Sequence, residues 1–160
     1  MRLWLPDSAA TEALGRILAL SRPTRAVVHL HGDLGAGKST LARALLRALG
    51  VRGAIHSPTY TLVERYPLDD GTEALHLDLY RIAGAGELEF LGLDPGEGAL
   101  WLVEWPEQGG AGLPAADLRL ELAIDGDGRS VQAIPLDVAG QEWLARLASD
   151  PELRALSRPG

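Results

Sequence analysis

The sequence predicts one α/β domain in which a mixed, mostly parallel sheet is flanked by helices and carries antiparallel hairpins. Three observations lead to this fold class: an apolar, β-rich run at 26–31 that passes through a glycine-rich turn into a helix, a second apolar run at 99–103, and a strong hairpin signal at 125–128. The chain has 160 residues, with no internal repeat and no long linker. We therefore expect one domain over residues 1–150 and a flexible tail over 151–160.

The first part of the chain alternates strands and helices. Pro6 ends a short N-terminal strand, and Asp7 or Ser8 can cap the helix that follows. Leucines at helical spacing predict a second helix, which Gly50 ends. The expected elements are a strand at 2–5, a helix at 7–20, a strand at 26–31 and a helix at 41–49.

The second part of the chain is richer in strands. A turn at 68–71 separates two β-rich runs that we expect to pair as an antiparallel hairpin, and Asp-Gly-Asp-Gly at 125–128 predicts another. The expected elements are strands at 60–66 and 74–80, a short helix at 87–93, a buried strand at 99–103, strands at 117–124 and 129–136, and a helix at 141–148.

Composition and charge exclude several classes of function. Cysteine is absent, which excludes disulfides, thiol chemistry and Cys-ligated metal sites. The net charge of −7 opposes a broad surface for nucleic acid or anionic membrane, because such surfaces need clustered Lys and Arg. No secretory signal and no apolar run long enough to span a membrane are evident, so we expect a cytoplasmic protein without membrane contact.

Residues 32–39 form the strongest motif. Gly32-Asp-Leu-Gly-Ala-Gly-Lys-Ser39 satisfies the phosphate-loop pattern G-x-x-x-x-G-K-[ST], and it lies between an expected strand and an expected helix, as the motif requires. Its glycines let backbone amides converge on phosphate oxygens at a helix N-terminus. Lys38, the sole lysine of the chain, can reach the β and γ phosphates, and the Ser39 hydroxyl can ligate Mg²⁺. The fold class is therefore sharpened to a P-loop NTPase-like domain.

Two acidic residues could assist the metal and the attacking water. Glu104 directly follows the apolar run 99–103, at the strand end where ligands bind in such folds. Asp78 lies between leucines in an alternating strand, on the same face as His76 and Tyr80. The spacing leaves open that Glu104 is a solvated strand-end acid and that Asp78 lies on an exposed face.

Other polar residues carry weaker signals. The segment 53–61 offers hydroxyls on Ser57, Thr59 and Thr61 as sensors of a γ-phosphate, although it could equally be a connecting loop. Trp105 follows Glu104 and could pack the core or face a partner. The four histidines show no metal-binding spacing and are expected to be structural or surface residues: His29, His31, His56 and His76.

Four segments resemble one known family. They are HGDLGAGKST (31–40), SPTYTLVERY (57–66), HLDLYR (76–81) with the following ELEFLGLD (87–94), and LVEWPE (102–107). Their order and approximate spacing resemble those of the bacterial TsaE family (older name YjeE), from about Leu3 to Leu136. The phosphate loop is shared with many proteins, whereas SPTYTLVE together with DLYR and VEW is far more specific.

The resemblance implies a function in tRNA modification. The family is the ATPase component of the machinery that installs threonylcarbamoyl on adenosine 37 of tRNAs reading codons that begin with A. Membership implies that hydrolysis is weak alone, that the chain acts with TsaB and TsaD, that the transfer chemistry belongs to TsaD, and that tRNA is met only through the complex.

The resemblance also implies roles for individual residues. Asp78, Glu104 and Lys38 would be needed for catalysis, and 56–64 would be a switch-like segment, with Trp105 supporting the site or its partner surface. Ser39 stands where the family commonly has Thr, and both supply the hydroxyl. The implied ATP contacts are Gly35, Ala36, Gly37, Lys38, Ser39 and Thr40 for the phosphates, and Thr11 and Arg129 near adenine and ribose; Mg²⁺ would be held by Ser39 and Glu104.

Two other functions remain open from the sequence. A small-molecule kinase also pairs a phosphate loop with a short α/β domain, but such kinases usually carry an Arg-bearing lid. Between Arg81 and Arg119 this chain has no Lys or Arg. A nucleotide-gated adaptor with incidental hydrolysis would use the same loop and switch, so the sequence does not separate it from an ATPase.

Overall fold

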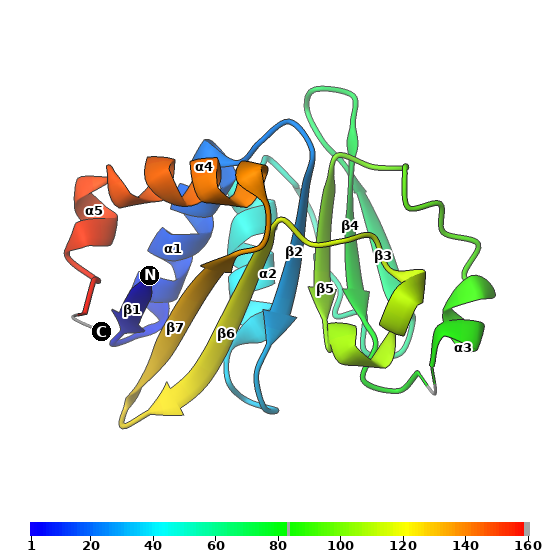
Figure 1. The fold of residues 1–160 in the computed structure, drawn as a ribbon, viewed down its shortest axis with the longest axis horizontal. Helices are drawn as coiled ribbons and strands as arrows, with labels where there is room; N and C mark the ends of the chain where they lie inside the picture. Colours follow the sequence, from blue (N-terminus) through cyan, green and yellow to red (C-terminus); the bar gives the residue numbers. More distant parts are fainter. Residues whose placement is uncertain (83, 159–160) are drawn as a thin grey trace.

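A seven-stranded sheet with helices packed on it makes up the computed structural model, which describes residues 1–82 and 84–158 (Figure 1). Two short 3₁₀ turns lie at Pro106–Gln108 and Gly110–Gly112. The elements are β1 (Arg2–Leu5), α1 (Ser8–Ser21), β2 (Ala26–His31), α2 (Lys38–Ala48), β3 (Val63–Pro67), β4 (Glu73–Asp78), α3 (Ala85–Glu89), β5 (Leu100–Glu104), β6 (Leu118–Asp125), β7 (Gly128–Pro135), α4 (Val138–Ala148) and α5 (Pro151–Arg154).

The order of the strands is β1-β7-β6-β2-β5-β4-β3. The four central strands, β6, β2, β5 and β4, are parallel to their neighbours within that group. Both edges are antiparallel: β3 pairs with β4, and β7 pairs with β6 and β1. The mixed sheet with a parallel centre and antiparallel hairpins confirms the predicted fold class, including both predicted hairpins.

Strands β4 and β5 are buried on both faces, whereas β2 and β6 are fully buried on one face only. On one face Leu100 and Leu102 of β5 join the core beneath α1 and α2, while Trp101 and Val103 belong to a second cluster on the other face. Because side chains alternate along a strand, Glu104 continues the face that carries Leu100 and Leu102. The last residue of β5 is thereby placed on the side of the sheet where α2 begins.

Helices α1 and α2 pack closely against each other. A Cβ added at Gly15 of α1 would lie 2.6 Å from the Cβ of Ala44 in α2, so only glycine allows this approach. Figure 1 shows α3 beside the β3 end of the sheet, whereas α4 and α5 lie at the β1 end, near both chain termini. In the described part of the chain, none of these helices has the length and apolarity needed to cross a membrane.

Several boundaries differ from the sequence-based expectations. The strand expected at 60–66 begins only at Val63, because residues 58–62 form a turn in which Leu62 N donates to Pro58 O at 2.8 Å and Leu62 takes a φ of 68°. The helix expected at 87–93 is Ala85–Glu89. The last long helix starts at Val138 rather than 141, since Asp137 caps it by accepting from Gly140 N.

The C-terminal segment packs on the domain where a flexible tail is expected. Leu153 of α5 is 1% exposed and belongs to the main core. Beyond it, Trp4 N donates to Leu156 O at 2.9 Å and Arg158 N donates to Arg2 O at 3.0 Å, so the chain end pairs with β1. The rest of the expected tail, residues 159–160, lies outside the described residues.

Candidate active site

The glycine-rich turn between β2 and α2 has the backbone shape that the motif predicts. Gly35 and Gly37 have φ angles of 83° and 105°, in the region that residues with a Cβ rarely adopt. Gly37 is also the N-cap of α2 and has no side chain with which to cap it. The first amides of α2 are therefore left without a side-chain partner at the positive end of the helix, which favours an anion.

Lys38 is folded onto its own loop. Its Nζ donates to the carbonyl oxygens of Gly32 and of Asp33, the latter at 3.1 Å, and lies 4.3 Å from the ring centroid of Trp105. The side chain is 5% exposed, and burial lowers the pKa of its ammonium, an effect that the nearby carboxylates of Glu104 and Asp78 oppose. Both acidic partners lie at the carboxyl ends of neighbouring strands.

Ser39 and Glu104 are in direct contact. The Ser39 hydroxyl oxygen lies 2.9 Å from Oε1 and 3.2 Å from Oε2 of Glu104, and the glutamate is 2% exposed. A carboxylate only accepts hydrogen bonds, so the hydroxyl donates its single proton to Glu104. The lone pairs of the Ser39 oxygen are then free for a cation. Glu104 is thus not a solvated strand-end acid.

Asp78 lies beside Glu104, since the two residues are paired in the register of β4 and β5. Its Oδ1 accepts from Tyr80 N at 3.0 Å, and its Oδ2 is 3.5 Å from the hydroxyl of Thr59. The side chain is buried, as are the other side chains on this face of β4. The alternative that Asp78 lies on an exposed face is therefore wrong.

The residue after Glu104 turns sharply out of the strand. Trp105 has a φ of 56°, which is unusual for a residue with a bulky side chain. The turn places its ring against Lys38 and against Tyr80, whose ring centroid lies 4.9 Å away. Of the two roles left open for Trp105, the structure shows packing, because the side chain is partly buried against the second cluster; it also contacts the phosphate-loop lysine.

These groups surround a cavity of about 290 Å³. Its lining combines two carboxylates with the loop residues and Lys38, which is the set of charges that a site for a metal–phosphate complex needs. Its lining includes Gly35, Ala36, Gly37, Lys38, Ser39, Thr40, Thr59, Asp78, Tyr80, Glu104, Trp105 and Arg129.

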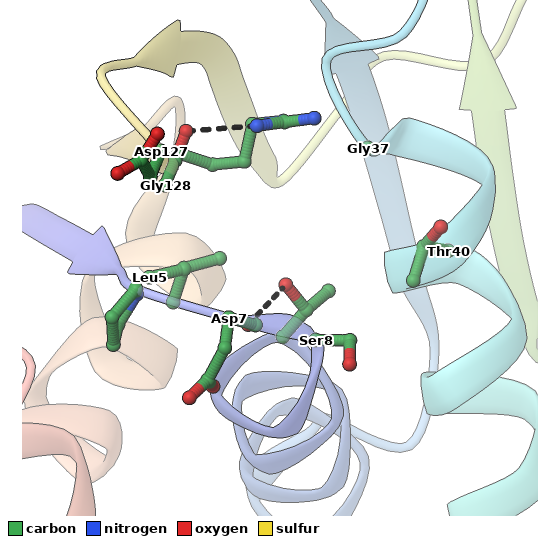
Figure 2. Close-up of a pocket in the computed structure, with 10 residues that line it drawn as sticks. Leu5, Asp7, Ser8, Gly37, Thr40, Asp127 and Gly128 are labelled. Carbon is green, nitrogen blue, oxygen red and sulfur yellow. Dashed lines mark hydrogen bonds between the residues drawn. The ribbon is translucent and has the colours of Figure 1, made fainter.

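A second cavity, of about 200 Å³, adjoins the first and is drawn in Figure 2. Figure 2 shows it between the β6–β7 hairpin, the start of α1 and the start of α2. Thr11 lines it and contacts the Asp7 carbonyl oxygen at 3.5 Å; Arg129 lines both cavities and donates to Gly35 O at 3.2 Å. Gly37 and Thr40 are also common to the two linings, so the two cavities lie next to each other around the loop.

The structure brings together all the residues that the resemblance implies for catalysis, ATP and Mg²⁺. Every one of them lines at least one of the two adjoining cavities. Of the three hydroxyls in the expected sensor segment, only that of Thr59 lines the first cavity. The Thr61 hydroxyl is hydrogen-bonded to Glu64 at 2.9 Å, and the Ser57 hydroxyl is hydrogen-bonded to that of Thr59 at 2.7 Å.

The residues present fit a magnesium ion that is bound mainly through a nucleotide. Ser39, Asp78 and Glu104 supply only oxygen atoms, the ligands that Mg²⁺ prefers, and the Ser39 proton is already directed towards Glu104, which leaves the lone pairs of the Ser39 oxygen available. In residues 1–82 and 84–158 no group of three or more His, Asp or Glu could hold a metal by itself. Such a cation would complete its coordination with phosphate oxygens and water.

Sequence reasoning missed His76 and Tyr80. His76 was expected to be structural or at the surface, yet its Nε2 lies 2.6 Å from Oε2 of Glu104. Tyr80 lines the first cavity and contacts both Asp78 and Trp105. The available signal was the alternation of the strand, which places His76 on the same face as Asp78.

The chain is similar to known proteins over most of its length. Residues 5–131 match the family model described as "Threonylcarbamoyl adenosine biosynthesis protein TsaE". A relative from Haemophilus influenzae, named tRNA threonylcarbamoyladenosine biosynthesis protein TsaE, is 38% identical over 153 residues, which cover 91% of this chain and 96% of the relative. A protein of the same name from Streptomyces coelicolor is 38% identical over 81% of this chain and 91% of its own.

A solved structure shares the fold. The crystal structure of Bacillus subtilis YdiB superposes with a TM-score of 0.71 and 24% sequence identity, covering 92% of this chain and 93% of that one. At this identity the match supports the architecture alone.

Proposed function

Because this chain belongs to the TsaE family, we propose that it binds and hydrolyses ATP with Mg²⁺ during formation of threonylcarbamoyladenosine in tRNA. The observation that carries the proposal is the hydrogen bond from Ser39 of the phosphate loop to Glu104 of a neighbouring parallel strand. This contact joins an anion-binding helix terminus to a carboxylate, as a metal–nucleotide site requires.

Different residues of the site would contact the phosphates and the metal. The loop amides at 35–40 hold the phosphate oxygens, and the Lys38 ammonium exchanges its two loop carbonyls for the β and γ phosphates. Ser39 offers its oxygen to the metal while Glu104 holds its proton. When bound, Mg²⁺ neutralises charge that develops on the phosphates.

Asp78 is the residue we assign to the attacking water. It lines the cavity beside Glu104 but makes no contact with Ser39, so one carboxylate serves the metal side and the other is free to orient a nucleophile. Thr59, 3.5 Å from Asp78, connects the switch-like segment to this position.

The second cavity is assigned to the nucleoside. Thr11 and Arg129 line it, and the Arg129 contact with Gly35 O connects it to the phosphate loop. Adenine and ribose would lie between the start of α1 and the β6–β7 hairpin, where Figure 2 shows an open space.

We assign TsaB and TsaD as partners and assign the transfer chemistry to TsaD. A chain with a net charge of −7 is poorly built to hold tRNA directly, so tRNA would be met through the complex. Since bacterial tRNA is modified in the cytoplasm, the function also predicts a cytoplasmic location.

The proposal is tested by measuring phosphate release from ATP by the purified chain with and without TsaB–TsaD. We expect slow release alone and faster release with the partners, and we expect Lys38→Ala to reduce the stimulated rate by about 100-fold, because it removes the charge aimed at the transferred phosphate. Arg43→Ala is the matched control, since Arg43 lies on α2 outside both cavities.

Two outcomes would favour the other functions. If TsaB–TsaD does not stimulate phosphate release and a metabolite screen finds a compound that accepts phosphate, the chain would be a small-molecule kinase rather than an ATPase. Nucleotide-dependent association with TsaB–TsaD in the absence of any phosphate release would indicate an adaptor.

A further inference from the structure

His76 has no role in the function described so far, although it is among the most buried polar residues of the chain. It lies in β4 and its side chain is 1% exposed. It lines neither of the two nucleotide cavities, so it does not touch a bound nucleotide directly. Any contribution to the site has to pass through a neighbouring residue.

That neighbour is Glu104. His76 Nε2 lies 2.6 Å from Oε2 of Glu104, while the Ser39 hydroxyl lies closer to Oε1, at 2.9 Å. Because the carboxylate only accepts, Nε2 carries the proton and donates it. The other ring nitrogen, Nδ1, is buried and has no hydrogen-bond partner among the described residues. Burying that nitrogen costs free energy, and the contact with Glu104 is what offsets it.

We propose that His76 is a positioning residue that holds Glu104 so that the Ser39 hydroxyl is oriented for Mg²⁺, and that it thereby sets the affinity of the nucleotide site for the cation. This inference rests on the proposed function. The hydrogen bond from His76 occupies Oε2 and leaves Oε1 as the acceptor for Ser39. The Ser39 proton then points at Glu104 and its lone pairs remain available to the metal.

Without His76, the carboxylate loses the bond that fixes its rotation. Ser39 already lies only 3.2 Å from Oε2, so its proton would be shared between two acceptor positions and its oxygen would no longer keep one orientation. Partners that orient metal ligands in this way typically change metal affinity by about 10- to 100-fold when they are removed. We expect a loss in this range, confined to the metal-dependent part of nucleotide binding.

Three variants separate this role from a structural one. His76→Phe removes the donor and keeps a ring of similar size, whereas His76→Gln places an amide donor near the position of Nε2. His29→Phe is the matched control, because His29 is also a strand histidine with a buried unpartnered Nε2, but it lies outside both cavities. If His76→Phe does not fold, His76→Asn takes its place, since its amide is too short to reach Glu104.

The measurement is ADP affinity, by calorimetry, without metal and across a Mg²⁺ series. Wild type and His29→Phe should bind ADP more tightly as Mg²⁺ rises, with the same half-saturating Mg²⁺ concentration. His76→Phe should keep the metal-free affinity within about threefold and need at least about tenfold more Mg²⁺, and His76→Gln should recover most of the loss. An unchanged Mg²⁺ requirement in His76→Phe would overturn the inference, as would an equal loss of metal-free and metal-dependent affinity.

A second comparison tests whether His76 acts through Glu104. In a Glu104→Ala background, adding His76→Phe should leave the Mg²⁺ requirement unchanged, because the residue that His76 positions is already gone. A further tenfold increase would show a different route and contradict the proposal. Failure of the wild-type chain to bind ADP with or without Mg²⁺ would instead remove the proposed function, and the inference with it.

Discussion

At the scale of single residues, hydrogen bonds hold the site in order, and a nucleotide would replace those made by Lys38. Lys38 satisfies its ammonium with the carbonyls of Gly32 and Asp33, and Ser39 satisfies its hydroxyl with Glu104. An arginine could not serve in place of Lys38, because a planar guanidinium does not fit the tight turn as a slim ammonium does. The loop therefore explains why the only lysine among 15 basic residues is found here.

Glu104→Gln tests the assignment of the metal side at this scale. The amide can still accept from Ser39 but carries no charge, so we expect ATP to bind within a few-fold of wild type while the stimulated turnover falls about 10- to 100-fold. Nucleotide affinity and phosphate release measured on the same preparation check this. Unchanged turnover would move the role to Asp78, and Asp78→Asn is the variant to compare.

At the scale of elements, the position of the phosphate loop depends on how α2 is held. The helix is pressed against α1 at Gly15, where a side chain would collide with Ala44 and with the backbone of Ala44 and Leu45. Because Lys38 and Ser39 are the first residues of α2, the packing of its middle sets the place of these two proposed site residues at its start.

Gly15→Ala is therefore expected to destabilise the protein even though alanine favours a helix. The helix gains up to about 1 kcal/mol in propensity, but the added methyl group forces two packed helices apart at a cost of about 1–3 kcal/mol. Urea unfolding should show a net loss of about 1–2 kcal/mol. Gly86→Ala in α3 is the control: a methyl group there meets no atom within 4 Å, so stability should be unchanged or slightly higher.

At the scale of the whole molecule, a pair of carboxyl groups joins the parallel centre of the sheet to the C-terminal helices. Asp117 accepts a hydrogen bond from Val27 N of β2 at 2.8 Å and lies beside the carboxyl group of Asp137, the N-cap of α4. Burial, reinforced by Asp137, raises the pKa of Asp117 to about 6. The folded state therefore binds a proton at this residue more tightly than the unfolded chain does.

This linkage predicts a pH dependence of stability. Between the unfolded pKa of 3.8 and the folded value of about 6, the folded state holds more protons, so the Asp117 contribution to stability is lost as pH rises through that range. Asp117→Asn should remove this slope from unfolding free energies measured between pH 4 and 7. The difference between the two profiles is the relevant quantity, because His29, whose pKa burial lowers to about 4, adds a slope of opposite sign. Parallel profiles would contradict the prediction.

Local sequence patterns are enough to predict most of the elements and the phosphate loop. Apolar periodicity, turn residues and a glycine motif act over a few neighbouring residues, and they were sufficient to place β2, β5, both hairpins and the strand-end position of Glu104. They were insufficient at two places: a local turn at 58–62 shortens β3, and a long-range pairing with β1 orders the chain end to residue 158.

Which of these residues contact one another depends on the tertiary structure. Ser39 and Glu104 are 65 residues apart, and His76 and Glu104 are 28 apart, so their contacts depend on the order and register of β2, β5 and β4. A shift of one residue in that register would turn Glu104 and His76 to the opposite face. The sequence therefore names the candidate acids, whereas the sheet selects Glu104 as the partner of Ser39 and brings His76 against it.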